Sequence, residues 1–215
     1  MSQIFHRSTN TLAKATIFGA VFVIAGVAWL GFMIDRSPYA TDVGDAKAQP
    51  IPFSHQHHVA GLGIDCRYCH NSVETSSFAG IPPTQTCMNC HAQIWTNAAM
   101  LEPVRESYRE NKPLVWTRVN RVADFVQFNH SIHINKGIGC VSCHGRVDLM
   151  PLTYKAEPMS MSWCLECHRA PEKFLRPRDK IFDMDWKSEN QAKQGAQLVK
   201  DYRVQRKTNC SVCHY

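Results

Sequence analysis

The longest apolar run of the chain lies near its N-terminus, over residues 15–34 (ATIFGAVFVIAGVAWLGFMI). An α-helix needs about 20 predominantly apolar residues in a row to cross a hydrocarbon core of about 30 Å. A signal peptide usually has an apolar stretch of only about 7–15 residues, and no small-x-small cleavage site follows this run closely. The pattern therefore predicts one membrane-spanning helix that is retained as an anchor.

The charges that flank this run predict its orientation. His6, Arg7 and Lys14 precede the run, and Asp35 follows it. Because positive residues stay on the cytoplasmic side of a bacterial membrane, residues 1–34 are expected to form a cytoplasmic N-terminus and a single-pass anchor. The rest of the chain is then expected on the periplasmic side of the cytoplasmic membrane.

Beyond the anchor, the hydrophobic pattern is weak. Residues 35–52 carry no apolar periodicity and predict a linker. In residues 53–215, only Met100–Tyr108 and residues 188–202 show a helical pattern. We therefore expect a mostly irregular periplasmic domain with short α-helices.

An internal repeat organises this domain. The segment FSHQHHVAGLGIDCRYCH aligns with the later segment FNHSIHINKGIGCVSCH. The alignment pairs two HxxH motifs and two Gly-x-Gly turns, with Gly61 set against Gly137 and Gly63 against Gly139. The repeat therefore indicates a duplicated structural unit.

Each repeat continues into a second CxxCH motif. The first module covers residues 53–91 and the second covers residues 128–168. Residues 92–127 form an insert between the modules, and residues 169–215 form a C-terminal segment that ends in a fifth CxxCH. The predicted plan is two modules of two motifs each, extended by one motif.

All ten cysteines fall in the five CxxCH motifs: Cys66, Cys69, Cys87, Cys90, Cys140, Cys143, Cys164, Cys167, Cys210 and Cys213. In c-type haem attachment, two thiols form thioethers to the porphyrin and the histidine ligates the iron. Disulfides give no reason for a histidine after every second cysteine. Tetrahedral zinc uses CxxC pairs two at a time and would leave one of the five over. The sequence therefore predicts five covalently bound haem c groups.

The ligands on the two faces of each iron come from different motifs. The predicted proximal ligands are the histidines of the CxxCH motifs, His70, His91, His144, His168 and His214. The two histidines of an HxxH motif lie on the same side of a helical turn but splay apart, so that each is expected to serve a different iron. The predicted distal ligands are therefore His55, His58, His130 and His133.

The fifth distal ligand is left open between two kinds of donor. His57 has no counterpart in the second module, and on a helix it points about 100° away from its neighbours. It is either the fifth ligand or a surface imidazole. The alternative is a thioether near the fourth motif, from Met150, Met159 or Met161. With either donor, all five irons would have two protein ligands. We therefore expect that no iron is open and that the chain has no catalytic site of its own.

The formal net charge of +6 does not indicate a nucleic-acid partner. Five haems would bring about ten propionate charges, partly offset by about one positive charge on each oxidised haem core. The oxidised protein with its haems would thus be near neutral. Its basic residues are expected to pair with propionates or to face solvent.

The repeated motif resembles the class III, cytochrome c3-like multihaem proteins. More narrowly, the single anchor and the segments GIDCRYCH, ETSSFAGIPPTQTCMNCHAQIW, FNHSIHINKGIGCVSCHGRVD and WCLECHRAPEKFLRP resemble the pentahaem subunit of alternative complex III. This resemblance extends over residues 12–214. The expected fold class is a class III-like multihaem cytochrome c, mostly irregular, with short α-helices wrapped around five haems and one N-terminal transmembrane helix.

The resemblance implies an electron-transfer subunit of a membrane quinol oxidoreductase, which relays electrons to a periplasmic cytochrome c or blue copper protein. It also implies partner subunits: an iron–sulfur subunit resembling molybdopterin oxidoreductases, quinol-binding membrane subunits resembling polysulfide reductase, and a monohaem cytochrome c. One alternative is a free-standing membrane-anchored quinol dehydrogenase, although Ser72 stands where the CxxCHxM motif of such proteins has methionine. The other is a multihaem reductase with an open iron.

Overall fold

A computed structural model describes residues 4–215 of the chain. The chain divides into two compact units, which meet between Val43 and Gly44. The first unit contains α1 (Ser8–Asp35) and the short helix α2 (Pro38–Thr41). The second unit, which we call the head, contains all of the CxxCH motifs.

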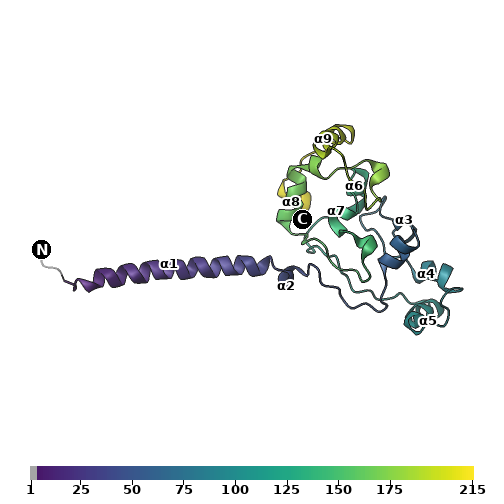
Figure 1. Cartoon of the computed structure of the whole chain (residues 1–215), viewed down its shortest axis with the longest axis horizontal. Helices are drawn as coiled ribbons and strands as arrows, with labels where there is room; N and C mark the ends of the chain where they lie inside the picture. The colour runs from purple at the N-terminus through teal and green to yellow at the C-terminus, as the bar shows by residue number, and fades with distance from the viewer. Residues whose placement is uncertain (1–3) are drawn as a thin grey trace. The chain divides into compact units, whose positions relative to one another are not determined.

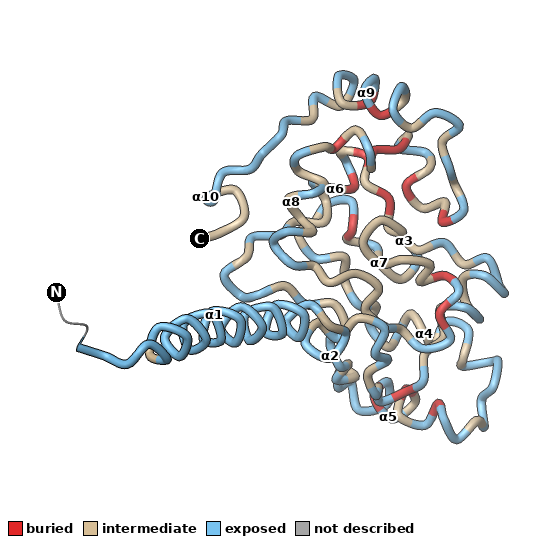
Figure 2. The backbone as a smooth tube through the Cα atoms, turned by 60° about the vertical axis from the view of Figure 1, so that its left-hand side comes forward, coloured by how far each residue is buried: buried red, intermediate tan, exposed pale blue. Residues whose placement is uncertain are grey.

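Helix α1 has 28 residues and contains the whole predicted apolar run. Its length and composition are sufficient for it to cross a membrane. None of its residues is buried, and the helix is exposed along almost its whole length (Figure 2). The predicted N-terminal apolar helix is thus present, and it begins before the apolar run at Ser8.

The head consists of short helices joined by irregular chain (Figure 1). Its α-helices are α3 (Cys66–Cys69), α4 (Thr84–His91), α5 (Glu102–Glu110), α6 (His130–Asn135), α7 (Val141–His144), α8 (Met161–Arg169), α9 (Gln191–Asp201) and α10 (Cys210–Cys213). The π-helix η1 (Gln56–Gly61) and the 3-10 helices η2 (Ala99–Leu101), η3 (Val147–Leu149), η4 (Pro171–Lys173) and η5 (Arg178–Lys180) complete it. Over residues 4–215 the only β structure consists of isolated bridges.

The two helices that were predicted within the head are confirmed. The first is α5, which begins with Pro103 in its first turn, where the missing amide proton costs no hydrogen bond. The second is α9, where the Asn190 side chain accepts a hydrogen bond from the Lys193 amide and so caps the helix. For each of the two helices, the predicted first and last residues lie within three residues of the observed ones.

The head has little apolar core for its length. One buried cluster contains Ile51, Leu101 and Val104, and a second contains Val73, Ile134 and Ile181. Buried residues are few and scattered along the backbone (Figure 2). The protein part of the head therefore has two small apolar clusters and not one continuous core.

The first module and the later part of the chain lie toward opposite ends of the head. Figures 1 and 2 both show α4 and α5 at one end and α9 at the other, with α7 between them. The C-terminal segment returns to the start of the second module, where the Gln127 amide donates to the Cys213 carbonyl at 2.8 Å. Val126 and His214 form an antiparallel bridge at the same place.

Candidate functional site

Each CxxCH motif lies on a single turn of helix. In α3 the His70 amide donates to the Cys66 carbonyl at 2.8 Å, and His144 and His214 make the same bond within their own motifs. A helical turn brings the two thiols and the following imidazole to one region of the surface. No disulfide joins any two of the ten cysteines. This arrangement suits two thioether bonds and one iron ligand for each motif.

The first motif of each module faces the first histidine of its own HxxH. The rings of His55 and His70 have centroids 6.5 Å apart and planes at 8°. The rings of His130 and His144 are also 6.5 Å apart, with planes at 5°. Two imidazoles on opposite faces of one metal, with metal–nitrogen bonds of about 2.0 Å, have centroids roughly 6 Å apart. Both pairs therefore fit a single iron between nearly parallel rings.

The second motif of each module faces the second histidine of the same HxxH. His58 and His91 have ring centroids 6.3 Å apart, with planes at 69°. His133 and His168 have centroids 6.2 Å apart, with planes at 62°. These separations fit one iron equally well, but the rings are strongly tilted. Each HxxH motif thus reaches two different CxxCH motifs, as the splay of its side chains predicted.

Hydrogen bonds fix the orientation of most of these rings. The Nδ1 atoms of His58, His70, His91, His130, His133 and His168 lie 2.6–3.2 Å from backbone carbonyl oxygens, to which each can donate. His55 Nδ1 is hydrogen-bonded to the Thr153 hydroxyl at 2.9 Å. When Nδ1 carries the proton, Nε2 keeps the free lone pair that a metal needs. These rings are therefore held in the form and orientation of axial ligands.

The imidazoles meet in pairs, which does not suit a zinc cluster. Over residues 4–215, no group of three or more histidine, cysteine or acidic side chains is arranged to hold a bare metal ion. A haem iron needs only two protein ligands, because the porphyrin supplies the other four. The donor set of this chain therefore fits haem.

Burial keeps several of the rings neutral. It lowers the pKa of His144 to about 4, and the nearby rings of His130 and His70 lower it further. Burial also lowers the pKa of His55 to about 4, with His70 as the next cause. Because His144 is affected by both His130 and His70, the first sites of the two modules must adjoin. The neutral imidazole is the form that ligates iron.

The two modules differ by one residue between HxxH and CxxCH. Ile64 and Ile138 donate backbone hydrogen bonds to the second HxxH histidine of their own modules. The preceding glycines, Gly63 and Gly137, have φ of +68° and +89°. The structure therefore pairs Gly63 with Gly137, and the predicted pairing of Gly61 with Gly137 was wrong by two positions. The extra residue of the first module is accommodated by the wider turn of the π-helix η1.

The structure does not bring His57 to the fifth motif. Its ring contacts Trp95 at 5.7 Å and His58 at 5.3 Å, both in or next to the first module. His214 instead contacts Phe125 at 5.6 Å. Within the described part of the chain, no ring contact joins His57 to His214. His57 therefore lies as a surface imidazole beside the His58 and His91 pair.

The three candidate methionines occupy different surroundings. Met150 is only 2% exposed and packs in the interior. Met159 has a left-handed backbone with φ of +52°. Met161 is 63% exposed and begins α8, three residues before Cys164. Burial, and next the nearby Cys213, raise the pKa of Cys164. The start of α8 is thus close to the fifth motif.

Two functional residues were not identified from the sequence. Thr153 orients His55 from 98 residues away, and Arg176 is a buried cation beside the Cys140 motif. Neither residue belongs to the repeat or to a motif. Only a pattern of long-range contacts could have identified them.

Comparison with known proteins indicates the class of the C-terminal part of the chain. Residues 126–215 match the family of cytochrome c7 and related cytochromes c, and this region contains three of the five CxxCH motifs. This part of the chain is thus similar to the multihaem cytochromes c, and its three CxxCH motifs fit covalently bound haem c. Its irregular fold with short helices agrees with the predicted class.

The chain is also similar to a curated relative. It is 36% identical over 99 residues to the multihaem cytochrome c subunit of the menaquinone reductase of Nitratidesulfovibrio vulgaris. The match covers 46% of the chain and 46% of that relative. The matching part thus spans about half the length of the relative.

Proposed function

We propose that the chain carries five haem c groups, one on each CxxCH motif. The observation that carries this proposal is the set of four imidazole pairs with centroids 6.2–6.5 Å apart. His55 and His70, His58 and His91, His130 and His144, and His133 and His168 are the proposed axial pairs. Bound haem supplies one-electron redox chemistry.

For the fifth haem, His214 is the proposed proximal ligand and a methionine is the proposed distal ligand. The ring contacts of His57 with Trp95 and His58 support a donor other than His57 for this haem. Met161 is favoured among the three methionines because it begins the helix whose Cys164 lies near Cys213. With two protein ligands for each iron, the chain would transfer electrons without binding a substrate of its own.

The proposed setting is a membrane complex that reacts with quinol, of the alternative complex III type. The segments that resemble its pentahaem subunit extend over most of the chain, and the curated relative is a subunit of a quinone-linked enzyme. Helix α1 would anchor the subunit with its N-terminus in the cytoplasm and the head in the periplasm. The expected partners are the iron–sulfur, quinol-binding and monohaem subunits, and a soluble periplasmic acceptor.

A second direction of electron flow is favoured by the relative. Because that protein belongs to a menaquinone reductase, the chain would alternatively carry electrons toward menaquinone. The two directions use the same haem ligands and the same anchor. They differ only in the partners at the two ends of the haem chain.

Both proposals can be tested on the complex extracted from membranes in mild detergent. We expect intact-mass analysis to give five haems on this chain, and we expect several larger chains to purify with it. Rapid mixing of the oxidised complex with menaquinol should reduce the haems, whereas haems that are oxidised by menaquinone after reduction would support the second direction. Fewer than five haems, or a chain that purifies alone, would contradict the proposal.

A further inference from the structure

Arg176 is a buried cation next to the first motif of the second module. Its side chain is 7% exposed, and its guanidinium packs against the backbone of Gly139, which precedes Cys140. A Cβ added at Gly139 would lie 2.5 Å from Arg176 Nε, so that only glycine leaves room for this contact. Burial is the main reason that the pKa of Cys140 is raised to about 11, and the charge of Arg176 acts against this rise.

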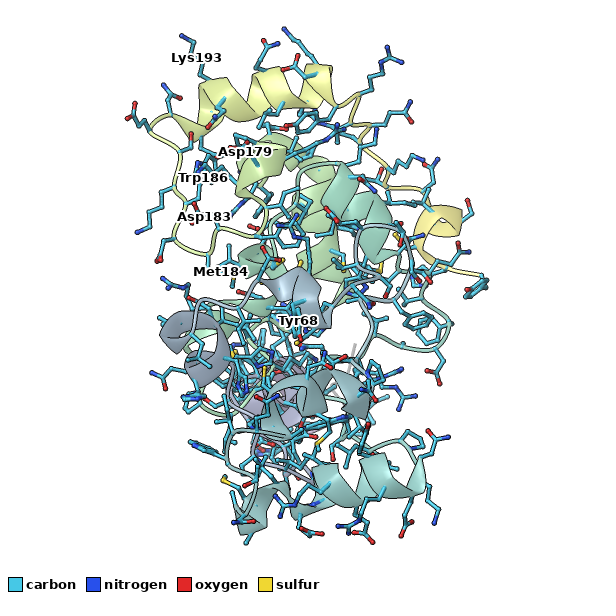
Figure 3. The ribbon with its side chains drawn as sticks, turned by 90° about the vertical axis from the view of Figure 1, so that its right-hand side faces the viewer. Tyr68, Asp179, Asp183, Met184, Trp186 and Lys193 are labelled. Atoms are coloured by element: carbon cyan, nitrogen blue, oxygen red, sulfur yellow. The ribbon has the colours of Figure 1, made fainter. Side chains whose placement is uncertain are left out.

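The segment before α9 holds the guanidinium in place. Arg176 NH1 donates to the carbonyl of Asp183 at 2.9 Å and to the carbonyl of Lys180 at 3.2 Å. The guanidinium also lies over the Trp186 ring, 5.1 Å from its centroid. Trp186 and Asp183 lie on the same side of the head (Figure 3). A planar arginine head that is fixed at several points has little freedom to move its charge.

No carboxylate forms an ion pair with this cation among residues 4–215. The charge of Asp183 acts to raise the pKa of Arg176, but the Asp183 carboxylate pairs with Lys180 at 3.6 Å. Arg176 Nε is buried and has no hydrogen-bond partner. Burial lowers the pKa of Arg176, but a guanidinium stays charged at neutral pH. A full positive charge therefore lies in the interior next to the Cys140 motif.

The equivalent position in the first module has the opposite character. Asp65 precedes Cys66 as Gly139 precedes Cys140, and its carboxylate binds the Arg67 guanidinium at 2.8 Å. Hydrogen bonds from Arg67 lower the pKa of Asp65 to about 2. This ion pair is about half exposed and is neutral as a whole. The two first sites, otherwise alike in ligands and ring angle, thus differ by one buried positive charge.

We propose that Arg176 raises the reduction potential of the haem on Cys140 and Cys143 above that of the haem on Cys66 and Cys69. The oxidised haem core carries one more positive charge than the reduced core, and a nearby buried cation disfavours it. Arg176 would thereby make the second of two adjoining sites the stronger electron acceptor. This inference depends on the proposed function, because both motifs must carry haem.

The test uses the full-length protein in detergent, titrated electrochemically and followed by EPR. Nearly parallel imidazole planes separate the iron d orbitals more than tilted planes do, so that the two first sites should share one type of low-spin signal. In the wild type this signal is expected to titrate in two steps. In Arg176→Gln the upper step should move down by the equivalent of a tenfold change in the ratio of reduced to oxidised haem, about 59 mV for one electron. Arg176→Lys keeps the charge and should restore most of the potential.

The matched control is Arg109→Gln, because Arg109 is an exposed arginine of α5 that pairs with Glu102. It should leave both steps unchanged. The intact mass shows whether each motif carries haem, and so distinguishes a failure of the proposed function from a failure of the role of Arg176. A wild type without haem on Cys140 and Cys143 would overturn the proposed function. A fully loaded Arg176→Gln variant with an unmoved upper step would overturn the role of Arg176 alone.

A second variant decides the question if Arg176→Gln does not assemble with haem. Gly139→Ala keeps the charge in the chain but places a methyl group where the guanidinium now packs. The arginine must then move away from the Cys140 motif, and the upper step should shift down, by less than in Arg176→Gln. An upper step that stays at the wild-type potential in Gly139→Ala would contradict the proposal.

Discussion

The two modules share one plan but surround their first sites differently. In both, the first HxxH histidine faces the first CxxCH histidine at 6.5 Å with nearly parallel rings. The first module reaches this geometry through a π-helix and an exposed ion pair, and the second through an α-helix and a buried arginine. The ligand geometry is thus preserved while the electrostatics change. With the role that we propose for Arg176, the duplicated site diverges in potential without any change in its ligands.

The largest expected effect is on the haem spin state, when the distal histidine of a strongly tilted ring pair is removed from either module. His58→Ala and His133→Ala each leave the thioethers and the proximal histidine in place, so that the mass should still show five haems. One iron would lose its sixth ligand, become high-spin and bind carbon monoxide. Absorption spectra with and without carbon monoxide measure this change.

His57→Ala provides the control for this pair, because the His57 ring stacks on Trp95 and faces no motif histidine of its own. It should leave all haems low-spin. A high-spin haem in His57→Ala would identify His57 as the fifth ligand. Unchanged spectra in His133→Ala would remove His133 from the ligand set.

The two equivalent glycines should differ in what an added methyl group costs. At Gly63 the only penalty is the positive φ, about 1–2 kcal/mol, because nothing lies within 4 Å of the new Cβ. At Gly137 the Cβ would also lie 2.8 Å from the Arg176 carbonyl, which adds about 1–3 kcal/mol of overpacking. Thermal unfolding of Gly63→Ala and Gly137→Ala should therefore rank Gly137→Ala as the less stable. Equal losses would show that the two turns are not held differently.

Asp65 should make a pH-dependent contribution to the free energy of unfolding that is smaller than the effect of the glycine substitutions. The second module has no equivalent carboxylate. The Asp65 carboxylate accepts the Arg67 amide and caps α3, so that Asp65→Ala should cost about 1 kcal/mol at neutral pH. The pKa of Asp65 is lowered to about 2, and the stabilisation is therefore present above its ordinary pKa and lost as the pH falls toward 2. Denaturant unfolding at several pH values tests this.

Asp124→Ala is a suitable comparison, because Asp124 forms an exposed ion pair with Arg121 and caps no helix. It should change stability by less than about 0.5 kcal/mol. A loss in Asp65→Ala that persists at the lowest pH would mean that packing, and not the charge, explains the effect.

The smallest expected signal concerns the fifth site. If Met161 is its distal ligand, the oxidised protein should show the weak long-wavelength band of a methionine–iron bond, and Met161→Leu should abolish it. Met159→Leu is the matched control. Loss of the band in Met159→Leu alone would transfer the assignment to Met159.

The sequence was sufficient to predict the geometry within each motif, because the residues of a motif lie close together in the chain. CxxCH and HxxH each lie within one helical turn, so that their chemistry follows from short-range geometry. The helices α5 and α9 were predictable for the same reason. The partner of each histidine was not predictable, because His55 and His70 are brought together by the fold and not by a pattern.

What the sequence missed depends on long-range packing or on a small irregularity. Thr153 and Arg176 act on residues far away in the chain, and no motif marks them. The glycine alignment failed because two Gly-x-Gly turns can be superposed in either of two registers. The positive φ of Gly63 and Gly137 resolves the register, and a single added residue in η1 explains the offset.

The bridge between Val126 and His214 has a consequence for how such a chain is put together. It joins the beginning and the end of the region that matches the cytochrome c7 family. A unit whose ends meet in space can be fused to another unit, or inserted into one, without disturbing its interior. The region from residue 126 onward thus begins and ends at one place in the head, while Val73 of the first module still packs against its Ile134 and Ile181.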